Sequence, residues 1–245
     1  MKRFERIITI VLDSVGIGEA PDAKSFNDQG ADTLGHLCSY WNGKLAIPQL
    51  EDLGIGRILR ATPLKGIKAK SGTSSAVGKM REVSAGKDSL DGHWEMMGVP
   101  VDSALDTFPN GFPQRLVEQI EQFSNRRVIL NQVYSGTRAI EDYGEEQIAE
   151  GALIVYTSGD SVLQVAACET VVPVEELYRI CRFIRFTLDD SGWQIGRVIA
   201  RPFIRMDSGS FRRTANRRDY TIVPGHETVL DIPVSYTHLT LPTKA

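Results

Sequence analysis

Short apolar runs separated by polar, glycine-containing loops define the pattern of this chain. The two clearest runs are RIITIVL at Arg6–Leu12 and LIVYT at Leu153–Thr157. Continuous β-branched and aliphatic runs of this length are typical of strands buried on both faces of a parallel sheet. Weaker strand patterns occur at Val77–Val83, Val128–Leu130, Val162–Ala167 and Gly196–Arg201.

Helical spacing of apolar residues occurs between these predicted strands. In PQRLVEQIEQF, Pro113–Phe123, apolar residues recur at Leu116, Ile120 and Phe123, and the proline fits the start of a helix. Further helices are predicted at Asp32–Leu37, Leu90–Met97, Glu145–Glu150 and Val174–Thr187. Strands that alternate with helices in this way predict the α/β fold class.

Composition places the chain among ordinary globular proteins. Hydrophobic residues make up 42% and charged residues 24% of the 245 positions, which argues against a disordered or fibrous chain. The 28 Lys and Arg against 31 Asp and Glu give a net charge of −3, which argues against a nucleic-acid binder with a strongly basic surface. No apolar run approaches the roughly 18 residues that span a bilayer. We therefore expect neither nucleic acid nor a membrane as a partner.

Cysteine usage and the N-terminus bear on the compartment. Cys38, Cys168 and Cys181 form no CxxC pair and are too few for a disulfide framework, so we expect three small buried side chains in a reducing, cytoplasmic setting. The N-terminal sequence MKRFERIITIVLD reaches Asp13 after a short apolar stretch, and no small-residue cleavage site follows. This pattern favours a buried strand over a signal peptide.

Two residues are candidates for phosphoryl-transfer chemistry. Asp13 follows the first apolar run, at the sheet edge where ligands gather in α/β folds, and a carboxylate there suits Mg²⁺ or Mn²⁺. Ser89 lies where a small-residue loop enters a predicted helix, whose N-terminal amides favour a phosphate. A cation shared by Asp13 and Ser89 would activate the serine hydroxyl. Taken alone, each residue is better explained by a structural role, Asp13 in a turn or as a helix cap and Ser89 as a helix N-cap.

A second group of residues suits a phosphorylated sugar. Asp160 lies three residues after the strand predicted at Leu153–Thr157, and a carboxylate there could accept hydrogen bonds from sugar hydroxyls. Planar guanidinium groups suit phosphate, and five arginines are candidates for this role: Arg197, Arg201, Arg213, Arg217 and Arg218. A solvated basic loop is the alternative interpretation. Sparse aromatic residues make an RNA-binding patch the weakest one.

Several longer segments carry a more specific pattern than any single residue. They are IVLDSVGIGEAPDA, GADTLGHL, SAGKDSLDGHWEMMGVP, LIVYTSGDSVLQVAACE and the pair GRVIARPF and FRRTANRRDY. Together they closely resemble the phosphopentomutases, metal-dependent members of the alkaline phosphatase superfamily. The resemblance runs from about residue 6 to about residue 231, which is nearly the whole chain.

The resemblance implies an enzyme that interconverts ribose 1-phosphate and ribose 5-phosphate, and their 2-deoxy counterparts, with two Mn²⁺ ions. In this family a phosphorylated hydroxyl residue passes its phosphoryl group to the bound sugar. Carried onto this sequence, that residue is Ser89, where most members have threonine, and Asp13 with Ser89 matches metal ligands. Asp160, Arg197 and Arg213 match residues that hold the pentose phosphate.

The fold that the resemblance implies is an alkaline-phosphatase-like α/β core, here incomplete, with an inserted α+β cap domain. Residues 1–104 are expected to form the N-terminal part of the metal-binding core, residues 105–221 the cap domain, and residues 222–233 the start of the return to the core. The family's other metal ligands, which include a DHG motif, have no counterpart in this sequence. We therefore interpret the chain as a truncated and nearly inactive mutase.

The last segment and the function each leave an alternative open. Residues 234–245, VSYTHLTLPTKA, resemble translated vector sequence and are expected to be non-native, although a disordered natural tail is the other interpretation. A non-catalytic sugar-phosphate-binding module is one functional alternative. Another phosphotransfer enzyme of the alkaline phosphatase superfamily is the second.

Overall fold

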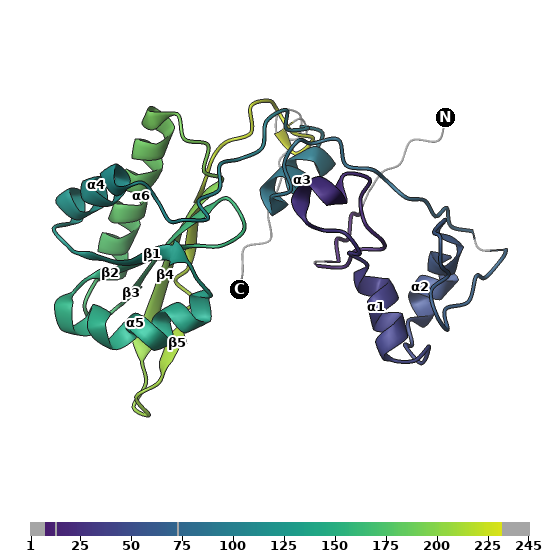
Figure 1. Ribbon diagram of the computed structural model, residues 1–245, viewed down its shortest axis with the longest axis horizontal. Helices are drawn as coiled ribbons and strands as arrows, with labels where there is room; N and C mark the ends of the chain where they lie inside the picture. The colour runs from purple at the N-terminus through teal and green to yellow at the C-terminus, as the bar shows by residue number, and fades with distance from the viewer. Residues whose placement is uncertain (1–7, 13, 73, 232–245) are drawn as a thin grey trace. The chain divides into compact units, whose positions relative to one another are not determined.

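The computed structural model describes residues 8–12, 14–72 and 74–231. Asp13 and the segment 234–245 therefore lie outside the described residues. The chain divides into two compact units, residues 1–82 and residues 83–245, and each is described by itself (Figure 1).

The first unit holds short helices around a small apolar core. Its elements in chain order are η1 (Ala23–Phe26), α1 (Thr33–Tyr40), α2 (Pro48–Asp52) and η2 (Ile55–Arg57). Leu34 and Cys38 on α1 pack against Leu64 at the centre of this core. The helix predicted at Asp32–Leu37 is confirmed, and the Asp32 side chain caps it by accepting a hydrogen bond from the Gly35 N–H at 3.2 Å.

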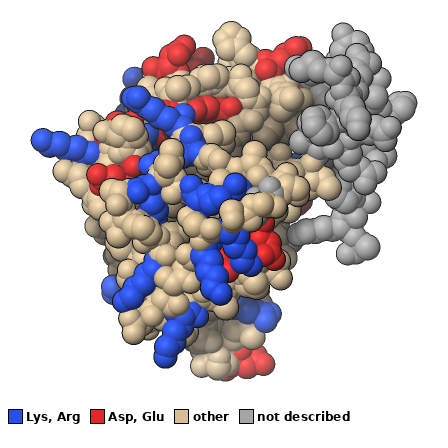
Figure 2. Space-filling view, turned by 90° about the vertical axis from the view of Figure 1, so that its right-hand side faces the viewer, with Lys and Arg blue, Asp and Glu red and all other residues tan. Residues whose placement is uncertain are grey.

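Two basic side chains in the first unit form ion pairs with carboxylates. The Arg60 guanidinium is hydrogen-bonded to Asp32 and lowers the pKa of that carboxyl, and Lys70 lies within ion-pair distance of Glu51 and Asp52. Figure 2 likewise shows Asp and Glu side chains among the Lys and Arg side chains on the face it draws. That face is therefore not a uniformly basic surface.

Two predicted strands of the first part of the chain are wrong over the described residues. Residues 8–12 and 77–83 are in no strand, and the apolar side chains of Ile8 and Ile10 are 74% and 80% exposed. The physical reason is the lack of a partner: no strand lies in the described part of residues 1–82. A single extended segment leaves its backbone N–H and C=O groups to water and buries neither face.

The second unit is a mixed α/β structure around a six-stranded sheet. Its elements in chain order are α3 (Ser89–Met96), α4 (Gln114–Ser124), β1 (Val128–Val133), α5 (Gly136–Glu150), β2 (Leu153–Thr157), β3 (Val162–Cys168), α6 (Val174–Ser191), β4 (Arg197–Arg205), β5 (Phe211–Arg213) and β6 (Arg218–Thr221). The strand order is β1-β2-β3-β4-β5, and β6 also pairs with β4. The β1–β2 and β3–β4 pairs are parallel, and the other pairs are antiparallel.

The sheet lies between two helical layers (Figure 1). One face packs against α4 and α6, with Leu163 and Val165 of β3 among the residues of that core. The other face packs against α5, with Ile154 and Tyr156 of β2 in a second core. Because successive side chains of a strand point to opposite faces, fully buried strands such as β2 supply both cores at once.

Most predicted elements of the second unit are confirmed. The helix predicted at Pro113–Phe123 is α4, and the strand predicted at Leu153–Thr157 is β2, which is buried at every position. The prediction at Glu145–Glu150 covers only the end of the longer helix α5. All three cysteines are free and buried, as expected from their spacing. None of the helices in the described residues is long and apolar enough to span a membrane.

Candidate functional site

Asp88 fixes the start of α3, the helix whose first residue is Ser89. Its Oδ1 atom accepts a hydrogen bond from the Leu90 backbone N–H at 2.8 Å. This is the contact of an N-cap, which satisfies one of the amides that a helix start leaves unpaired. Asp88, and not Ser89, therefore caps the helix, so the purely structural interpretation of Ser89 as the N-cap is wrong.

The second oxygen of Asp88 ties the helix to the sheet. Oδ2 accepts a hydrogen bond at 2.7 Å from the backbone N–H of Ser161, in the loop between β2 and β3. The Ser161 hydroxyl donates to the Asp106 carbonyl at 2.6 Å and accepts from the Gly196 N–H at 3.0 Å. These contacts fix the start of α3 at the edge of the sheet where β2 ends and β3 and β4 begin.

Ser89 presents a free hydroxyl at this edge. The residue is exposed, and within the described part of the chain no hydrogen bond to its hydroxyl is found. A phosphate carried by this hydroxyl would lie at the positive end of α3, next to backbone amides without helical partners. The position therefore suits a hydroxyl that is reversibly phosphorylated.

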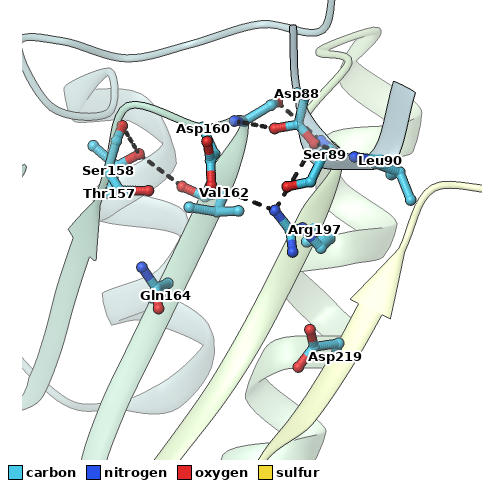
Figure 3. A network of polar contacts seen from close by, with 12 residues as sticks. Asp88, Ser89, Leu90, Thr157, Ser158, Asp160, Val162, Gln164, Arg197 and Asp219 are labelled. Atoms are coloured by element: carbon cyan, nitrogen blue, oxygen red, sulfur yellow. Dashed lines mark hydrogen bonds and ion pairs between the residues drawn. The ribbon is translucent and has the colours of Figure 1, made fainter. Parts of the chain in front are cut away.

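Arg197, the first residue of β4, lies between two carboxylates (Figure 3). Its Nη2 atom is 3.8 Å from Asp88 Oδ1 and 3.7 Å from Asp160 Oδ2, within ion-pair range but longer than a hydrogen bond. Its Nε atom is buried and has no hydrogen-bond partner among the described residues. Three of the predicted site residues, Ser89, Asp160 and Arg197, therefore meet at one edge of the sheet.

Further along the same sheet face lies a cluster of arginines around a buried tyrosine. The hydroxyl of Tyr156 is fully buried without a hydrogen-bond partner among the described residues. Burial raises the pKa of Tyr156, and the charges of Arg201, Arg213 and Arg217 oppose that rise. Figure 3 shows Gln164 and Asp219 on this face, away from Ser89 and Asp160.

The start of α5 closes one side of this arginine cluster. A Cβ atom on Gly136, the first residue of α5, would lie 2.5 Å from Arg213 Nη2 and 2.7 Å from the Tyr156 hydroxyl. Only glycine therefore lets the helix start approach these two groups. The first residue of α5, the tyrosine hydroxyl and Arg213 therefore lie close together. Helix-start amides and guanidinium groups are the kinds of donor that suit an anion such as phosphate.

Arg201 contributes uncompensated positive charge to the cluster. Its Nε atom donates a hydrogen bond to Gln164 Oε1 at 3.0 Å, and burial, reinforced by the neighbouring arginines, lowers its pKa. Arg217 forms a bidentate pair with Asp219 at 2.7 and 2.6 Å. Within the described residues neither Arg201 nor Arg213 pairs with a carboxylate, so a bound anion would supply the missing negative charge.

Tyr156→Phe is expected to weaken phosphate binding without weakening the fold. Removing a buried hydroxyl that lacks a partner removes its desolvation cost of about 1–3 kcal/mol. The free energy of unfolding without phosphate should therefore stay equal or rise, while the affinity for inorganic phosphate falls about fivefold, the effect of roughly one lost hydrogen bond. Chemical denaturation and calorimetric titration measure the two quantities.

Tyr134→Phe is the matched control for this change. The Tyr134 hydroxyl donates a hydrogen bond to Asp142 at an exposed position. Its removal should leave phosphate affinity unchanged. A clear loss of stability in Tyr156→Phe, with phosphate affinity intact, would contradict the assignment of the Tyr156 hydroxyl to an anion site.

Arg213 does not join the group formed by Ser89, Asp160 and Arg197. The register of β5 places Arg213 beside Phe203 of β4, about 20 Å along the strand from Arg197 at roughly 3.3 Å per residue. Arg213 belongs instead to the arginine cluster. The predicted site residues are therefore divided between two places on one sheet face.

The described residues do not by themselves fit a metal centre. No group of three or more His, Cys, Asp or Glu side chains suited to a metal ion occurs within residues 8–12, 14–72 and 74–231. Asp13, the predicted carboxylate ligand, lies outside these residues. Mn²⁺ and Mg²⁺ take several oxygen ligands, and a lone serine hydroxyl at position 89 does not meet that need.

The structure also adds residues that the motifs did not single out. Asp88 and Ser161 hold the helix start against the sheet, and Gln164 orients Arg201. A sequence signal existed for Asp88, since an aspartate directly before a helix is a common N-cap. The one sequence signal for Gln164 was its position within an otherwise apolar strand. A polar side chain that is buried there needs a hydrogen-bond partner.

The second unit is a mixed α/β fold that carries a helix-start serine beside a carboxylate and an arginine, with a cluster of arginines on the same sheet face. Groups of this kind suit phosphate. The comparisons with known proteins name a particular group. The chain is 53% identical over 229 residues to a phosphopentomutase from Levilactobacillus brevis, a match that covers 94% of this chain and 58% of that protein. It is also 53% identical over 228 residues to the phosphopentomutase of Limosilactobacillus reuteri, covering 93% of this chain and 57% of that protein.

These matches confirm the resemblance to phosphopentomutases predicted from the motifs. The chain spans somewhat more than half the length of the curated relatives it matches. No protein-family model matches it.

Proposed function

We propose that this chain is the larger part of a phosphopentomutase, a cytoplasmic enzyme that interconverts ribose 1-phosphate and ribose 5-phosphate and their 2-deoxy counterparts. Ser89 carries the phosphoryl group, and Asp160 and Arg197 bind the pentose beside it. Arg213 holds a phosphate within the arginine cluster. The observation that carries the proposal is the meeting of Ser89, Asp160 and Arg197 at one sheet edge, in a chain 53% identical to phosphopentomutases.

The chemistry of these side chains supports the assignment. Asp88 holds the start of α3 so that a phosphate on Ser89 would face the amides of the helix start. Arg197 lies beside it and can stabilise negative charge on the transferring phosphoryl oxygens. The Asp160 carboxylate is an acceptor for sugar hydroxyls, and the unpaired guanidinium groups of Arg201 and Arg213 suit a phosphate further along the face.

The domain organisation belongs to the same proposal. Residues 1–104 form the N-terminal part of an alkaline-phosphatase-like core, residues 105–221 a cap domain, residues 222–233 the return to the core, and residues 234–245 a non-native tail. The sheet of β1–β6 falls within the cap range. Two Mn²⁺ ions are proposed for the whole protein, with Asp13 and Ser89 among the ligands and the others supplied by residues that this sequence does not contain.

A completed protein tests this function. Residues 1–231 would be joined to the C-terminal region of the Levilactobacillus brevis relative, and turnover of ribose 1-phosphate would be measured with Mn²⁺ present and after chelation. We expect Mn²⁺-dependent turnover by the completed protein and at least about 10³-fold less by the 245-residue chain, whose described residues hold no cluster of metal ligands. A completed protein that folds but shows no turnover would refute the proposal. Full activity of the 245-residue chain would refute the claim that this chain is a nearly inactive fragment.

A non-catalytic sugar-phosphate-binding module is the second candidate. The observation that favours it is that the described residues hold arginines suited to phosphate but no cluster of metal ligands. Binding of ribose 5-phosphate by the 245-residue chain, together with an inactive completed protein, would select this candidate.

A further inference from the structure

Arg213 and Arg217 flank a short loop between β5 and β6. Arg213 is the last residue of β5, and Arg217 directly precedes β6. Both strands pair with β4. The intervening residues Thr214, Ala215 and Asn216 are outside any strand, so the sheet alone does not fix their conformation.

One carboxylate holds this loop from the neighbouring strand. Glu169 directly follows β3, and its own backbone N–H donates to the Phe203 carbonyl on β4 at 2.9 Å. Its Oε1 atom accepts hydrogen bonds from the Thr214 hydroxyl and from Asn216 Nδ2, the latter at 3.0 Å. Within the described residues Glu169 forms no ion pair with a lysine or arginine. Among the described residues, the side chain of Glu169 therefore bonds to the loop rather than to a basic side chain.

The same loop has further anchors that orient it. The Thr214 N–H donates to the Pro202 carbonyl at 3.1 Å, and the Asn216 N–H donates to the Thr214 hydroxyl oxygen at 3.3 Å. From α6, the Tyr178 hydroxyl donates to the Asn216 carbonyl at 2.8 Å. Removing Glu169 would leave the backbone anchored at these points but would free the side chains of Thr214 and Asn216.

We propose that Glu169 is a positioning residue for phosphate binding: through Thr214 and Asn216 it fixes the loop that presents Arg213 and Arg217 to the Tyr156 hydroxyl. This inference rests on the proposed function, since it assigns a role within the phosphate-binding part of that site. A carboxylate near an anion site costs affinity through like-charge repulsion. Its presence is explained by the two hydrogen bonds that its Oε1 atom accepts.

The test compares Glu169→Ala with Glu169→Gln in the 245-residue chain, with inorganic phosphate as the probe in calorimetric titrations. The amide oxygen of glutamine can accept the same two hydrogen bonds, whereas alanine accepts none. We expect Glu169→Ala to weaken phosphate binding about tenfold and Glu169→Gln to bind as tightly as the unsubstituted chain or more tightly. Glu145→Ala removes an exposed carboxylate that pairs with Arg205, and it should change nothing.

A second readout separates positioning from general stability. In the completed protein, Glu169→Ala should raise KM for ribose 5-phosphate about tenfold and change kcat less than threefold, because Ser89 lies at the other end of the face. If Glu169→Ala does not fold, Asn216→Ala removes one of the two hydrogen bonds and should raise KM in the same direction. Equal phosphate affinity in Glu169→Ala and the unsubstituted chain would overturn the inference, as would an equal loss in Glu169→Gln.

The outcomes also separate this inference from the proposed function. If the unsubstituted chain binds phosphate and Glu169→Ala binds it equally well, only the role of Glu169 fails. If the unsubstituted chain binds no phosphate at millimolar concentration, the arginine cluster is not an anion site, and both the role of Glu169 and the phosphate-binding part of the proposed function fail.

Discussion

Replacing Ser89 by alanine in the completed protein is expected to lower kcat by at least about 10³-fold, the order of loss seen when an enzyme's nucleophile is removed. The exposed hydroxyl at the start of α3 is the group that the proposed mechanism phosphorylates, and no other hydroxyl occupies that helix start. Alanine favours helices and leaves the Asp88 cap in place, so the fold should be unaffected. Steady-state turnover and mass spectrometry of the phosphorylated protein measure the effect.

Two further substitutions sharpen this result. Ser89→Thr keeps a hydroxyl at the same position and should retain activity within about tenfold, as expected for two residues that both form phosphoesters. Ser208→Ala removes an exposed hydroxyl in the loop between β4 and β5 and serves as the control. Phosphate incorporation that persists in Ser89→Ala would assign the phosphorylated residue to another position.

Replacing Arg197 by alanine is the substitution with the second largest expected effect, a loss of about 10²–10³-fold in kcat/KM, typical for removal of one group that stabilises transition-state charge. Arg197 lies between Asp88 and Asp160. Without the Arg197 guanidinium, no positive charge would offset the repulsion between the two carboxylates, or between them and the phosphoryl group. Kinetics with ribose 1-phosphate and a thermal unfolding curve distinguish lost chemistry from lost folding.

Arg205→Ala is the control for this change. Arg205 ends the same strand and pairs with the exposed Glu145 at 2.9 Å, and exposed pairs contribute little to stability. Arg205→Ala should therefore retain activity within about twofold. A similar loss in Arg205→Ala and Arg197→Ala would mean that net charge, and not the position of Arg197, sets the rate.

The sequence predicted the second unit well because its signals are local. The apolar spacing of Leu116, Ile120 and Phe123 and the run at Leu153–Thr157 report a helix face and a doubly buried strand, which neighbouring residues of the same unit then cover. The short strands β5 and β6 escaped prediction because their register depends on β4, a contact across the sheet that no local pattern encodes.

The strand predicted at Arg6–Leu12 shows the opposite case. Its pattern is as apolar as that of β2, yet the described residues 8–12 are exposed and lie in no strand. A strand forms only where a second strand satisfies its backbone hydrogen bonds, and the described part of the first unit contains none. The apolar pattern indicates which side chains a strand would bury, but it does not indicate whether a second strand is present to pair with it.

The sequence singled out most residues of the candidate site but not their arrangement. Arginine-rich segments and an aspartate after a buried strand indicated phosphate and sugar, and Ser89, Asp160 and Arg197 do meet. The separation of Arg213 from them follows from the pairing of β5 with the far end of β4. The roles of Glu169 and Gln164 follow from hydrogen bonds between residues distant in sequence.

The two oxygens of Asp88 have a consequence for inhibitor design. One of them holds the Leu90 amide on α3, and the other holds the Ser161 amide beside Asp160. A compound seated on Asp160 that immobilises this loop would slow hydrogen exchange at the Leu90 amide, which Asp88 links to the loop. Screening for slowed exchange at that single amide would therefore find compounds that bind beside Asp160 without any enzymatic assay.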